Sequence, residues 1–277
     1  MKLKFGLALP NNDARLVAEL AQLAEQTGWD GCFLGDFIWC EDPMVALAAA
    51  AMTTHHIRLG TMVTPAPIRR PWKVASESVS VDRLSDGRLV LGMGTGAVWM
   101  GWQAFPDEVT DVKTRAEMLD ETIDILTLLY QRKQFDFDGK HYHLKLTQLD
   151  EMHYPPQPIQ QPRIPIWVPA IWPRRKSMMR AMKCDGLLPE KMTSEGHVDV
   201  TPDDVREIKA YVDANRTLDT PYDIVMSGKI TGLDPSQRQE QLDQWIEAGV
   251  TWWIEVFWGE PEEIVPERIR QGPPRAN

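Results

Sequence analysis

The residues best suited to hold a ligand follow two short apolar runs, Ile57–Val63 and Arg88–Met93. The first run leads into Thr64, Pro65 and a pair of arginines, and the second leads into the glycine-rich Gly92–Gly96. A helical pattern lies between the runs, so the segment predicts a parallel strand–helix–strand unit. Ligands of parallel α/β folds bind beyond the carboxyl ends of the strands. The segment therefore predicts both an architecture and the location of a site.

The run Gly92–Ala97 matches the loose dinucleotide pattern G-x-G-x-x-[G/A] after a strand. That fingerprint belongs in the first βα turn of a nucleotide-binding domain, whereas three strand-like segments precede it here. Several tryptophans and Pro106 follow, which is a poor start for the helix that the motif requires. We therefore expect Gly94, Thr95 and Gly96 to let a ligand approach the backbone, with a ligand-free tight turn as the alternative.

Asp36 follows the apolar run Gly31–Gly35 and is the candidate catalytic residue. A carboxylate at a strand end could bind a ligand N–H group or tune a proton, and pairing with a nearby cation is the alternative. Two basic clusters, Arg69-Arg70 and Arg174–Lys176, also follow strands. Such local positive charge on an acidic chain suits a phosphate, with a solvated helix start as the alternative.

Other chemically active groups are scattered. His141 and His143 share one face of a predicted strand, but no further ligands converge on them, so we expect no metal site. The sequence has no serine-hydrolase elbow, P-loop or H-E-x-x-H motif. The three cysteines show no C-x-x-C spacing and are typical of reduced thiols in a cytoplasmic protein.

Composition limits the partners and the size of the fold. The formal net charge of −10 argues against nucleic acid and anionic membranes as partners. We expect neither a signal peptide nor a membrane span, because no apolar run is long enough to cross a bilayer. With 277 residues, of which 43% are hydrophobic, the chain can build one large α/β domain, which we expect to cover residues 1–277.

Strand-like and helix-like segments alternate along the chain, eight of each. This alternation favours a closed (β/α)8 TIM barrel, and a doubly wound open sheet is the alternative. After the fourth strand, Asp138-Gly139 between alternating aromatic and polar residues predicts a β-hairpin insertion. The predicted strands are Leu3–Leu9, Gly31–Gly35, Ile57–Val63, Arg88–Met93, Ile164–Val168, Gly186–Leu188, Asp223–Thr231 and Val250–Phe257. Proline-containing caps at Asp42, Thr201 and Asp234 predict the starts of three helices.

Five segments carry a family resemblance. They are TPAPIRRPWKVASESVSVDRLSDGRLVLGMGTG, RAEMLDETIDILTLLY, FDFDGKHYHL, PPQPIQQPRIPIWV and RRKSMMRAMKCDGLLP. Together they resemble the bacterial luciferase-like flavin-dependent oxidoreductases, a (β/α)8 barrel family. The resemblance implies FMN or the deazaflavin coenzyme F-420 as the cofactor and monooxygenation or two-electron redox of a small organic substrate. It also implies a homodimer and, for a monooxygenase, a separate flavin reductase as a partner.

The resemblance also implies the placement of the cofactor. The flavin ring should lie near Asp36, Thr61, Met62 and Val63, with a non-proline cis peptide bond near Val63. The phosphoribityl chain should pass Gly94, Thr95 and Gly96. The loop after the fifth strand should close on the phosphate.

Two positions depart from the common family pattern. The phosphate loop contains two prolines, which lack N–H donors, so the backbone of Ala170, Ile171 and Trp172 must supply the contacts, with Arg174 adding charge. Phe37 stands where members that use the deazaflavin frequently carry a histidine, which favours FMN. Tryptophans are expected to wall the pocket, at positions 39, 99, 102, 172 and 258. The alternatives to a flavin oxidoreductase are a non-enzymatic flavin-binding member and a flavin-independent barrel lyase or hydrolase.

Overall fold

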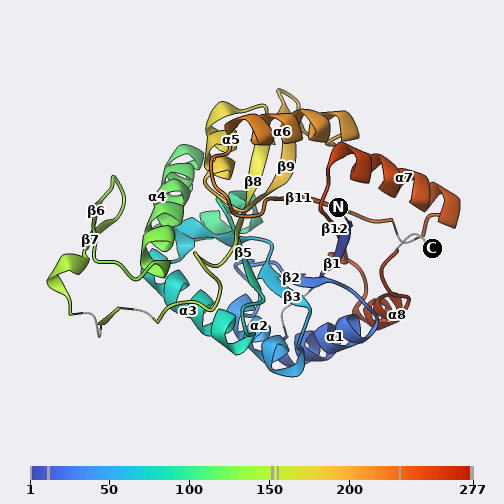
Figure 1. The fold of residues 1–277 in the computed structure, drawn as a ribbon, viewed down its shortest axis with the longest axis horizontal. Helices are drawn as coiled ribbons and strands as arrows, with labels where there is room; N and C mark the ends of the chain where they lie inside the picture. The colour runs from blue at the N-terminus through green and yellow to red at the C-terminus, as the bar shows by residue number, and fades with distance from the viewer. Residues whose placement is uncertain (1, 11–12, 151–152, 155, 231, 275–277) are drawn as a thin grey trace.

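The computed structural model describes residues 2–10, 13–150, 153–154, 156–230 and 232–274. Eight parallel strands form a closed barrel surrounded by helices (Figure 1). The barrel closes where β12 pairs in parallel with β1, from Lys4 opposite Trp252 to Ala8 opposite Val256. The barrel strands are β1 (Lys4–Ala8), β2 (Gly31–Leu34), β3 (Arg58–Thr61), β5 (Leu89–Gly94), β8 (Ile166–Trp172), β9 (Gly186–Thr193), β11 (Asp223–Gly228) and β12 (Trp252–Val256). The predicted closed barrel is confirmed.

A helix follows each barrel strand and covers its outer face (Figure 1). The predicted caps form, since Asp42 accepts from the Met44 N–H at 2.8 Å and Thr201 and Asp204 make a reciprocal capping box. The Asp234 side chain accepts from the N–H groups of Ser236 and Gln237 at the start of its helix. The helices are α1 (Ala14–Gln26), α2 (Pro43–Thr53), α3 (Pro71–Leu84), α4 (Val112–Tyr130), α5 (Arg175–Met182), α6 (Pro202–Asn215), α7 (Pro235–Ala248) and α8 (Val265–Arg270). None of the described helices has the length and apolar character needed to span a membrane.

Two barrel strands run further than their sequence predicted. β8 continues through Pro169 to Trp172, and β9 continues through Pro189 to Thr193. The predicted ends of these two strands were wrong. A proline removes one backbone N–H donor, but the strand continues when the residues around it still pair with the next strand. Here Pro169 lies opposite Leu188, and Ala170 lies opposite Pro189.

Short elements decorate the barrel. β10 (Gly196–Val198) pairs antiparallel with the end of β9, and β4 (Thr64–Pro65) extends beside β5. The segments β6 (Asp136–Asp138) and β7 (His143–Lys145) form a separate antiparallel pair beyond α4 (Figure 1). Thr231, the last residue of the predicted strand Asp223–Thr231, lies outside the described residues. Asn11 and Asn12, which follow the predicted strand Leu3–Leu9, also lie outside them.

A layer of three aromatic side chains fills the middle of the barrel. The ring centroid of Phe33 lies 5.3 Å from that of Trp167 and 5.8 Å from that of Trp252. Glycines on neighbouring strands make room for these rings. A Cβ atom on Gly60 would lie 2.9 Å from the Phe33 ring, and one on Gly186 would lie 2.5 Å from the Trp167 ring. The large aromatics and the interior glycines are therefore parts of one packing solution.

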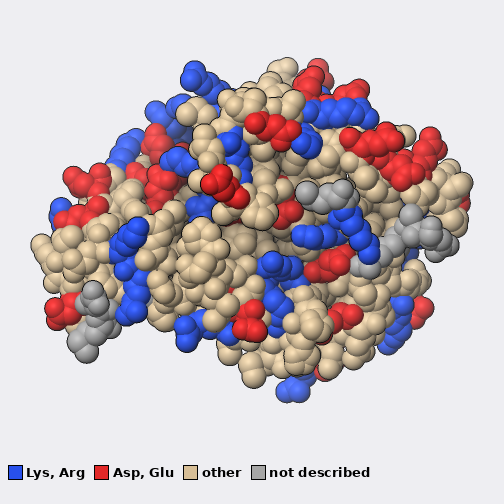
Figure 2. All heavy atoms as spheres, viewed as in Figure 1, with Lys and Arg blue, Asp and Glu red and all other residues tan. Residues whose placement is uncertain are grey.

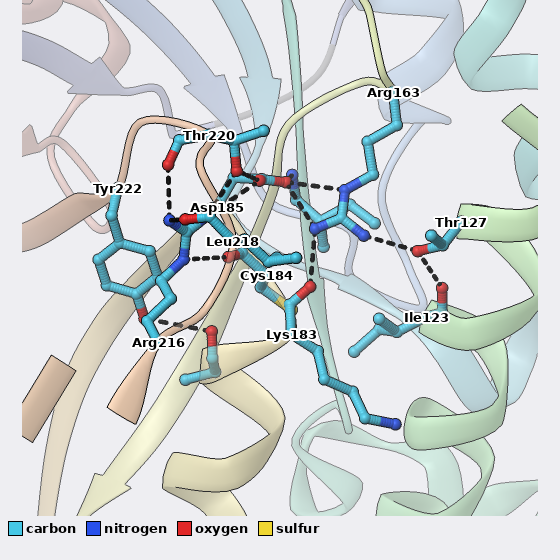
Figure 3. A network of polar contacts seen from close by, with 12 residues as sticks. Ile123, Thr127, Arg163, Lys183, Cys184, Asp185, Arg216, Leu218, Thr220 and Tyr222 are labelled. Atoms are coloured by element: carbon cyan, nitrogen blue, oxygen red, sulfur yellow. Dashed lines mark hydrogen bonds and ion pairs between the residues drawn. The ribbon is translucent and has the colours of Figure 1, made fainter. Parts of the chain in front are cut away.

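A buried polar network joins three segments near the amino ends of the strands (Figure 3). The Asp185 carboxylate accepts from Arg163 Nε at 3.1 Å and from Thr220 Oγ1 at 2.7 Å. Arg216 Nη2 lies 3.5 Å from the other side of the same carboxylate. Arg163 also donates to Thr127 Oγ1 on α4 and to the Lys183 carbonyl. One carboxylate thus joins the loops that precede β8, β9 and β11.

Candidate functional site

A cavity of about 660 Å³ opens at the carboxyl ends of the barrel strands. Its size falls in the range of small-molecule sites. The lining is mixed, with apolar side chains beside several polar and charged ones, most of which come from β9, β10 and β11 or the residues next to them. The lining residues are Met62, Val63, Pro169, Leu188, Pro189, Glu190, Lys191, His197, Val198, Asp199, Val200, Val225, Met226, Ser227, Gly228, Lys229, Gln241, Trp245, Trp253 and Trp258.

Strand alternation decides which side chains reach the interior. On β8, Trp167 belongs to the interior cluster, whereas Val168 and Ala170 pack outward against the helices. On β9, Leu187 packs outward while Leu188 packs against the interior cluster. Glu190 is two residues beyond Leu188 and therefore shares its interior face.

The predicted ring contacts Met62 and Val63 line the cavity. The peptide bond between them is cis, as the family resemblance implies. Thr61 does not line the cavity; its hydroxyl is buried and donates to the Gly92 carbonyl at 2.8 Å. A Cβ atom on Gly94 would lie 2.6 Å from Val63 Cγ2, so this glycine allows Val63 to take its position against β5.

Thr95 and Gly96 lie over a buried cation that the sequence reasoning missed. Arg115 on α4 is 1% exposed, and its Nε donates to the Thr95 carbonyl at 2.6 Å. A Cβ atom on Gly96, whose φ is +76°, would lie 2.7 Å from Arg115 Nη2. No described carboxylate lies within 4.0 Å of this guanidinium, and its Nη2 makes no hydrogen bond with described residues. Burial lowers the pKa of Arg115, while Glu108 acts in the opposite direction. Arg115 Nη1 donates to the Val109 carbonyl at 2.6 Å, so a buried positive charge without a direct ion pair lies beneath the predicted phosphoribityl path.

The position of Arg115, the first residue of RAEMLDETIDILTLLY, in the helical pattern could have indicated its buried role. It falls on the face of α4 that its neighbours Leu119 and Leu126 bury. A charged residue on the apolar face of a helix indicates a buried role, because burying a charge without a partner is costly.

The predicted phosphate loop is partly occupied by protein contacts. The Ile171 N–H donates to Ser177 Oγ at 2.9 Å. Trp172 lies against α6, where its Nε1 donates to Glu207 at 3.1 Å and its ring meets Tyr211 edge-on. Ala170 is buried against the helix layer, while Arg174 is exposed at the start of α5. Of these four residues, Arg174 has the side chain best placed for a ligand from solvent.

Asp36 is buried and paired rather than open to the cavity. Its carboxylate accepts from Arg69 Nε at 2.9 Å. Arg69 also contacts Asp42 at 2.8 Å and Glu77 at 3.4 Å, so three carboxylates share one guanidinium. Burial raises the pKa of Asp36, although Arg69 acts in the opposite direction. The structure therefore shows the pairing contact, and a catalytic role for Asp36 stays a prediction.

The charged side chains at the cavity differ in their pairing. Lys191 contacts Asp204 at 2.6 Å, and Lys229 pairs with Glu260. The Glu190 side chain makes no hydrogen bond or ion pair with the described residues. Burial raises the pKa of its carboxyl, while His197 acts against this. Sequence reasoning missed Glu190 because the strand was expected to end before it. Across the visible surface, acidic and basic side chains are interspersed (Figure 2).

The predicted tryptophan wall forms in part. Trp258 lines the cavity, and its buried indole N–H has no hydrogen-bond partner among the described residues. Trp102 is buried, with the guanidinium of Arg115 5.9 Å from its ring centroid. Trp39 and Trp99 are 76% and 78% exposed and do not line the cavity. No group of three potential metal ligands occurs among the described residues.

Residues 4–270 match the family described as luciferase-like monooxygenase. The chain belongs to this family. It is 31% identical over 157 residues to the oxygenase component of a flavin-dependent trigonelline monooxygenase from Acinetobacter baylyi, covering 55% of this chain and 42% of that protein. It is 29% identical over 180 residues to an F-420-dependent glucose-6-phosphate dehydrogenase from Gordonia bronchialis, covering 61% of this chain and 51% of that protein. The chain thus spans about half the length of these curated relatives.

Solved structures share the fold of this luciferase-like chain. A coenzyme F-420-dependent tetrahydromethanopterin reductase from Methanopyrus kandleri superposes with a TM-score of 0.73 at 18% identity, covering 98% of this chain and 99% of that one. A monooxygenase from Streptomyces bottropensis superposes with a TM-score of 0.74 at 18% identity, covering 97% of each chain. At these identities the likeness concerns the barrel.

Proposed function

We propose that the chain is a flavin-dependent oxidoreductase of the monooxygenase type, which uses reduced FMN to act on a small organic substrate. The mouth cavity is the observation that supports the proposal. It has a volume of about 660 Å³ and is lined by the predicted ring contacts Met62 and Val63 and by Trp258. A wall that combines apolar side chains with several polar ones suits a flat ring system that carries polar atoms at its edge. Family membership supplies the cofactor class, since relatives are named for flavin and for F-420.

The residues present fit the cofactor. Met62, Val63 and Met226 would hold the isoalloxazine ring, and the Trp258 side chain would lie at the opposite wall of the cavity. The phosphate would lie near the Thr95–Gly96 backbone, where the buried charge of Arg115 favours an anion. Arg174 would add a second, solvent-facing cation.

When bound, the reduced flavin would supply the two electrons of the reaction. The chain itself contributes orientation and a dry pocket. Met62, Val63 and Val225 cover the inner wall of the cavity and exclude water from it. The aromatic layer of Phe33, Trp167 and Trp252 closes the barrel below the cavity.

Coenzyme F-420 is the alternative cofactor, and a relative named for it supports that possibility. The structure favours FMN on one observation. The two lysines of the cavity, Lys191 and Lys229, are already paired with carboxylates, so they offer little free charge to a polyanionic tail. Phe37, in place of the histidine frequent in deazaflavin-dependent members, agrees with this.

The proposal extends to the setting of the enzyme. Residues 1–277 would form one functional domain of a cytoplasmic homodimer, with reduced FMN supplied by a separate reductase. Exposed apolar side chains on α2 and α3 (Val45, Met52 and Trp72) support a dimer, because such side chains are often covered by a partner. The relative named as an oxygenase component supports a separate reductase.

Titration with FMN and with F-420, followed by flavin fluorescence, tests the proposal directly. We expect FMN to bind more tightly than F-420. The oxidation of reduced FMN in the presence of a substrate panel then separates an enzyme from a binding protein. Failure to bind either cofactor at tens of micromolar, a weak affinity of roughly −6 kcal/mol, would refute the flavin assignment. Binding without accelerated oxidation for any substrate would favour the non-enzymatic member of the family.

A further inference from the structure

Glu190 presents a carboxyl group to the interior of the mouth cavity. It lies on β9, two residues beyond Leu188, whose side chain packs against the interior cluster of the barrel. Residues two apart on a strand share one face, so Glu190 continues this inward face above the packed core. Its side chain is half-buried and lines the cavity together with Met62 and Val63.

Neighbouring carboxylates at the mouth of the barrel are engaged by cations. Asp36 is paired with Arg69, and Asp204 with Lys191. The Glu190 side chain, in contrast, makes no hydrogen bond or ion pair with any described residue, whereas its backbone pairs with Ile171 of β8. A carboxyl group at the wall of a cavity without such partners keeps its hydrogen-bonding capacity for whatever occupies the cavity.

The other titratable groups that line this side of the cavity are identifiable. His197 on β10 and Asp199 just beyond it are exposed, while Lys191 and Lys229 are held in their ion pairs. Among these groups, His197 acts electrostatically on the Glu190 carboxyl. The desolvated setting raises the pKa of the Glu190 carboxyl, which moves its protonation towards neutral pH, where a proton donor is useful.

We infer that Glu190 exchanges a proton with the substrate in the mouth cavity, and that the substrate carries an oxygen or nitrogen function at the reacting end. The inference rests on the proposed function. In the donor direction, the O–H bond of the Glu190 carboxyl breaks and the proton forms a new bond to the substrate heteroatom. The carboxylate that remains regains a proton from water at the mouth, so charge and atoms balance over the cycle.

The first experiment asks whether Glu190 faces the occupant of the cavity. The protein is coupled to an amine with a carbodiimide, with and without FMN, and peptides are mapped by mass spectrometry. Glu195, which is exposed at the β9–β10 turn, is the internal control. At an FMN concentration of about 100 times Kd, we expect coupling at Glu190 to slow by up to about a hundredfold, because only about one per cent of the sites remain free. Coupling at Glu195 should not change.

The second experiment measures whether the Glu190 carboxyl takes up a proton when the cavity is filled. FMN binding is followed by calorimetry in buffers of different ionisation enthalpy, which gives the number of protons taken up. Filling the cavity removes water from Glu190 and raises the pKa of its carboxyl further, so the wild type and Glu195→Gln should take up the same number of protons at mildly acidic pH. Glu190→Gln should take up fewer, since its side chain cannot titrate. Comparison with the variant cancels the contribution of the FMN phosphate.

The outcomes separate the two proposals. FMN binding with equal protection of both glutamates and equal proton uptake in all three proteins would overturn the role of Glu190 and leave the flavin assignment intact. A wild-type protein that binds neither FMN nor F-420 would remove both proposals. Thermal unfolding of Glu190→Gln should match the wild type, because the substitution breaks no contact among the described residues.

Discussion

Replacing Asp185 with asparagine should destabilise the protein strongly without touching the mouth cavity. The Asp185 carboxylate lies between Arg163 and Arg216 in the network of Figure 3. The side chains of all three residues are more than nine-tenths buried. An amide keeps nearly the same shape but removes the negative charge, so two buried guanidinium groups lose their common counter-ion.

The size of the effect follows from this geometry. Removing one partner of a buried ion pair typically costs roughly 3–5 kcal/mol, because an uncompensated charge stays buried. Several contacts of Arg163 survive, including those to Thr127 Oγ1 at 2.6 Å and to the Lys183 carbonyl at 2.7 Å. We therefore expect a loss of about 3 kcal/mol in the free energy of unfolding, near the lower end of the range.

Urea unfolding followed by circular dichroism measures this loss. With a denaturant slope of about 3 kcal/mol/M, the midpoint should fall by roughly 1 M. Asp124→Asn is the matched control, because it removes an exposed partner of Lys183 at 2.9 Å and should cost less than about 1 kcal/mol. Equal midpoints for the two variants would refute the reasoning that the Asp185 network stabilises the amino-end face of the barrel.

Three further substitutions test the site and its electrostatics. Gly94→Val should push Val63, which lies 2.6 Å from the new Cβ, towards the cavity and weaken FMN binding about tenfold or more, as fluorescence titration would show; unchanged affinity would contradict the ring placement. Arg115→Gln should weaken FMN about tenfold but leave riboflavin, which lacks the phosphate, unaffected, and equal losses would argue against a phosphate role. Asp223→Asn tests a pH dependence of stability. Burial raises the pKa of the Asp223 carboxyl in the folded protein. The contribution of this carboxyl to the free energy of unfolding is therefore most favourable at low pH and falls as the pH rises through that pKa. The variant should lose this slope and be more stable than the wild type at neutral pH, and parallel pH curves in urea unfolding would contradict it.

The barrel could be predicted from the sequence because its signals are local. Apolar runs of strand length alternate with amphipathic helices, and proline-containing caps set the starts of α2, α6 and α7. The strand ends at Pro169 and Pro189 were wrong because pairing across the barrel rim, which sequence does not display, continues past a proline. β10 was missed for the same reason, since it exists by pairing with the extended β9.

The site was harder to predict because it depends on side-chain direction and on charge pairing. Met62 and Val63 line the cavity, and their contact with a flavin stays a prediction, whereas Asp36 is engaged by Arg69, a residue 33 positions away. Glu190 and Arg115 were missed in the sequence and became recognisable only in the structure. Each side chain is recognisable because it forms no ion pair with the described residues, and that property appears only when all neighbouring segments are in place.

The aromatic layer inside the barrel has a consequence for how this protein can change over evolution. The rings of Phe33, Trp167 and Trp252 fit because the neighbouring interior positions are glycines, which have no Cβ atom. A larger residue at one of these glycines therefore requires a smaller residue in place of a ring. A single enlargement such as Gly6→Ala, whose new Cβ atom would lie 2.7 Å from Ile254 Cδ1 and 2.8 Å from the Phe33 ring, should be damaging alone and less damaging together with Phe33→Leu, which frees part of that space. Drift in this layer would then proceed by paired steps, and each trimmed ring would deepen the mouth cavity from below. The floor of the site, more than its exposed loops, would set how long a substrate the barrel can admit.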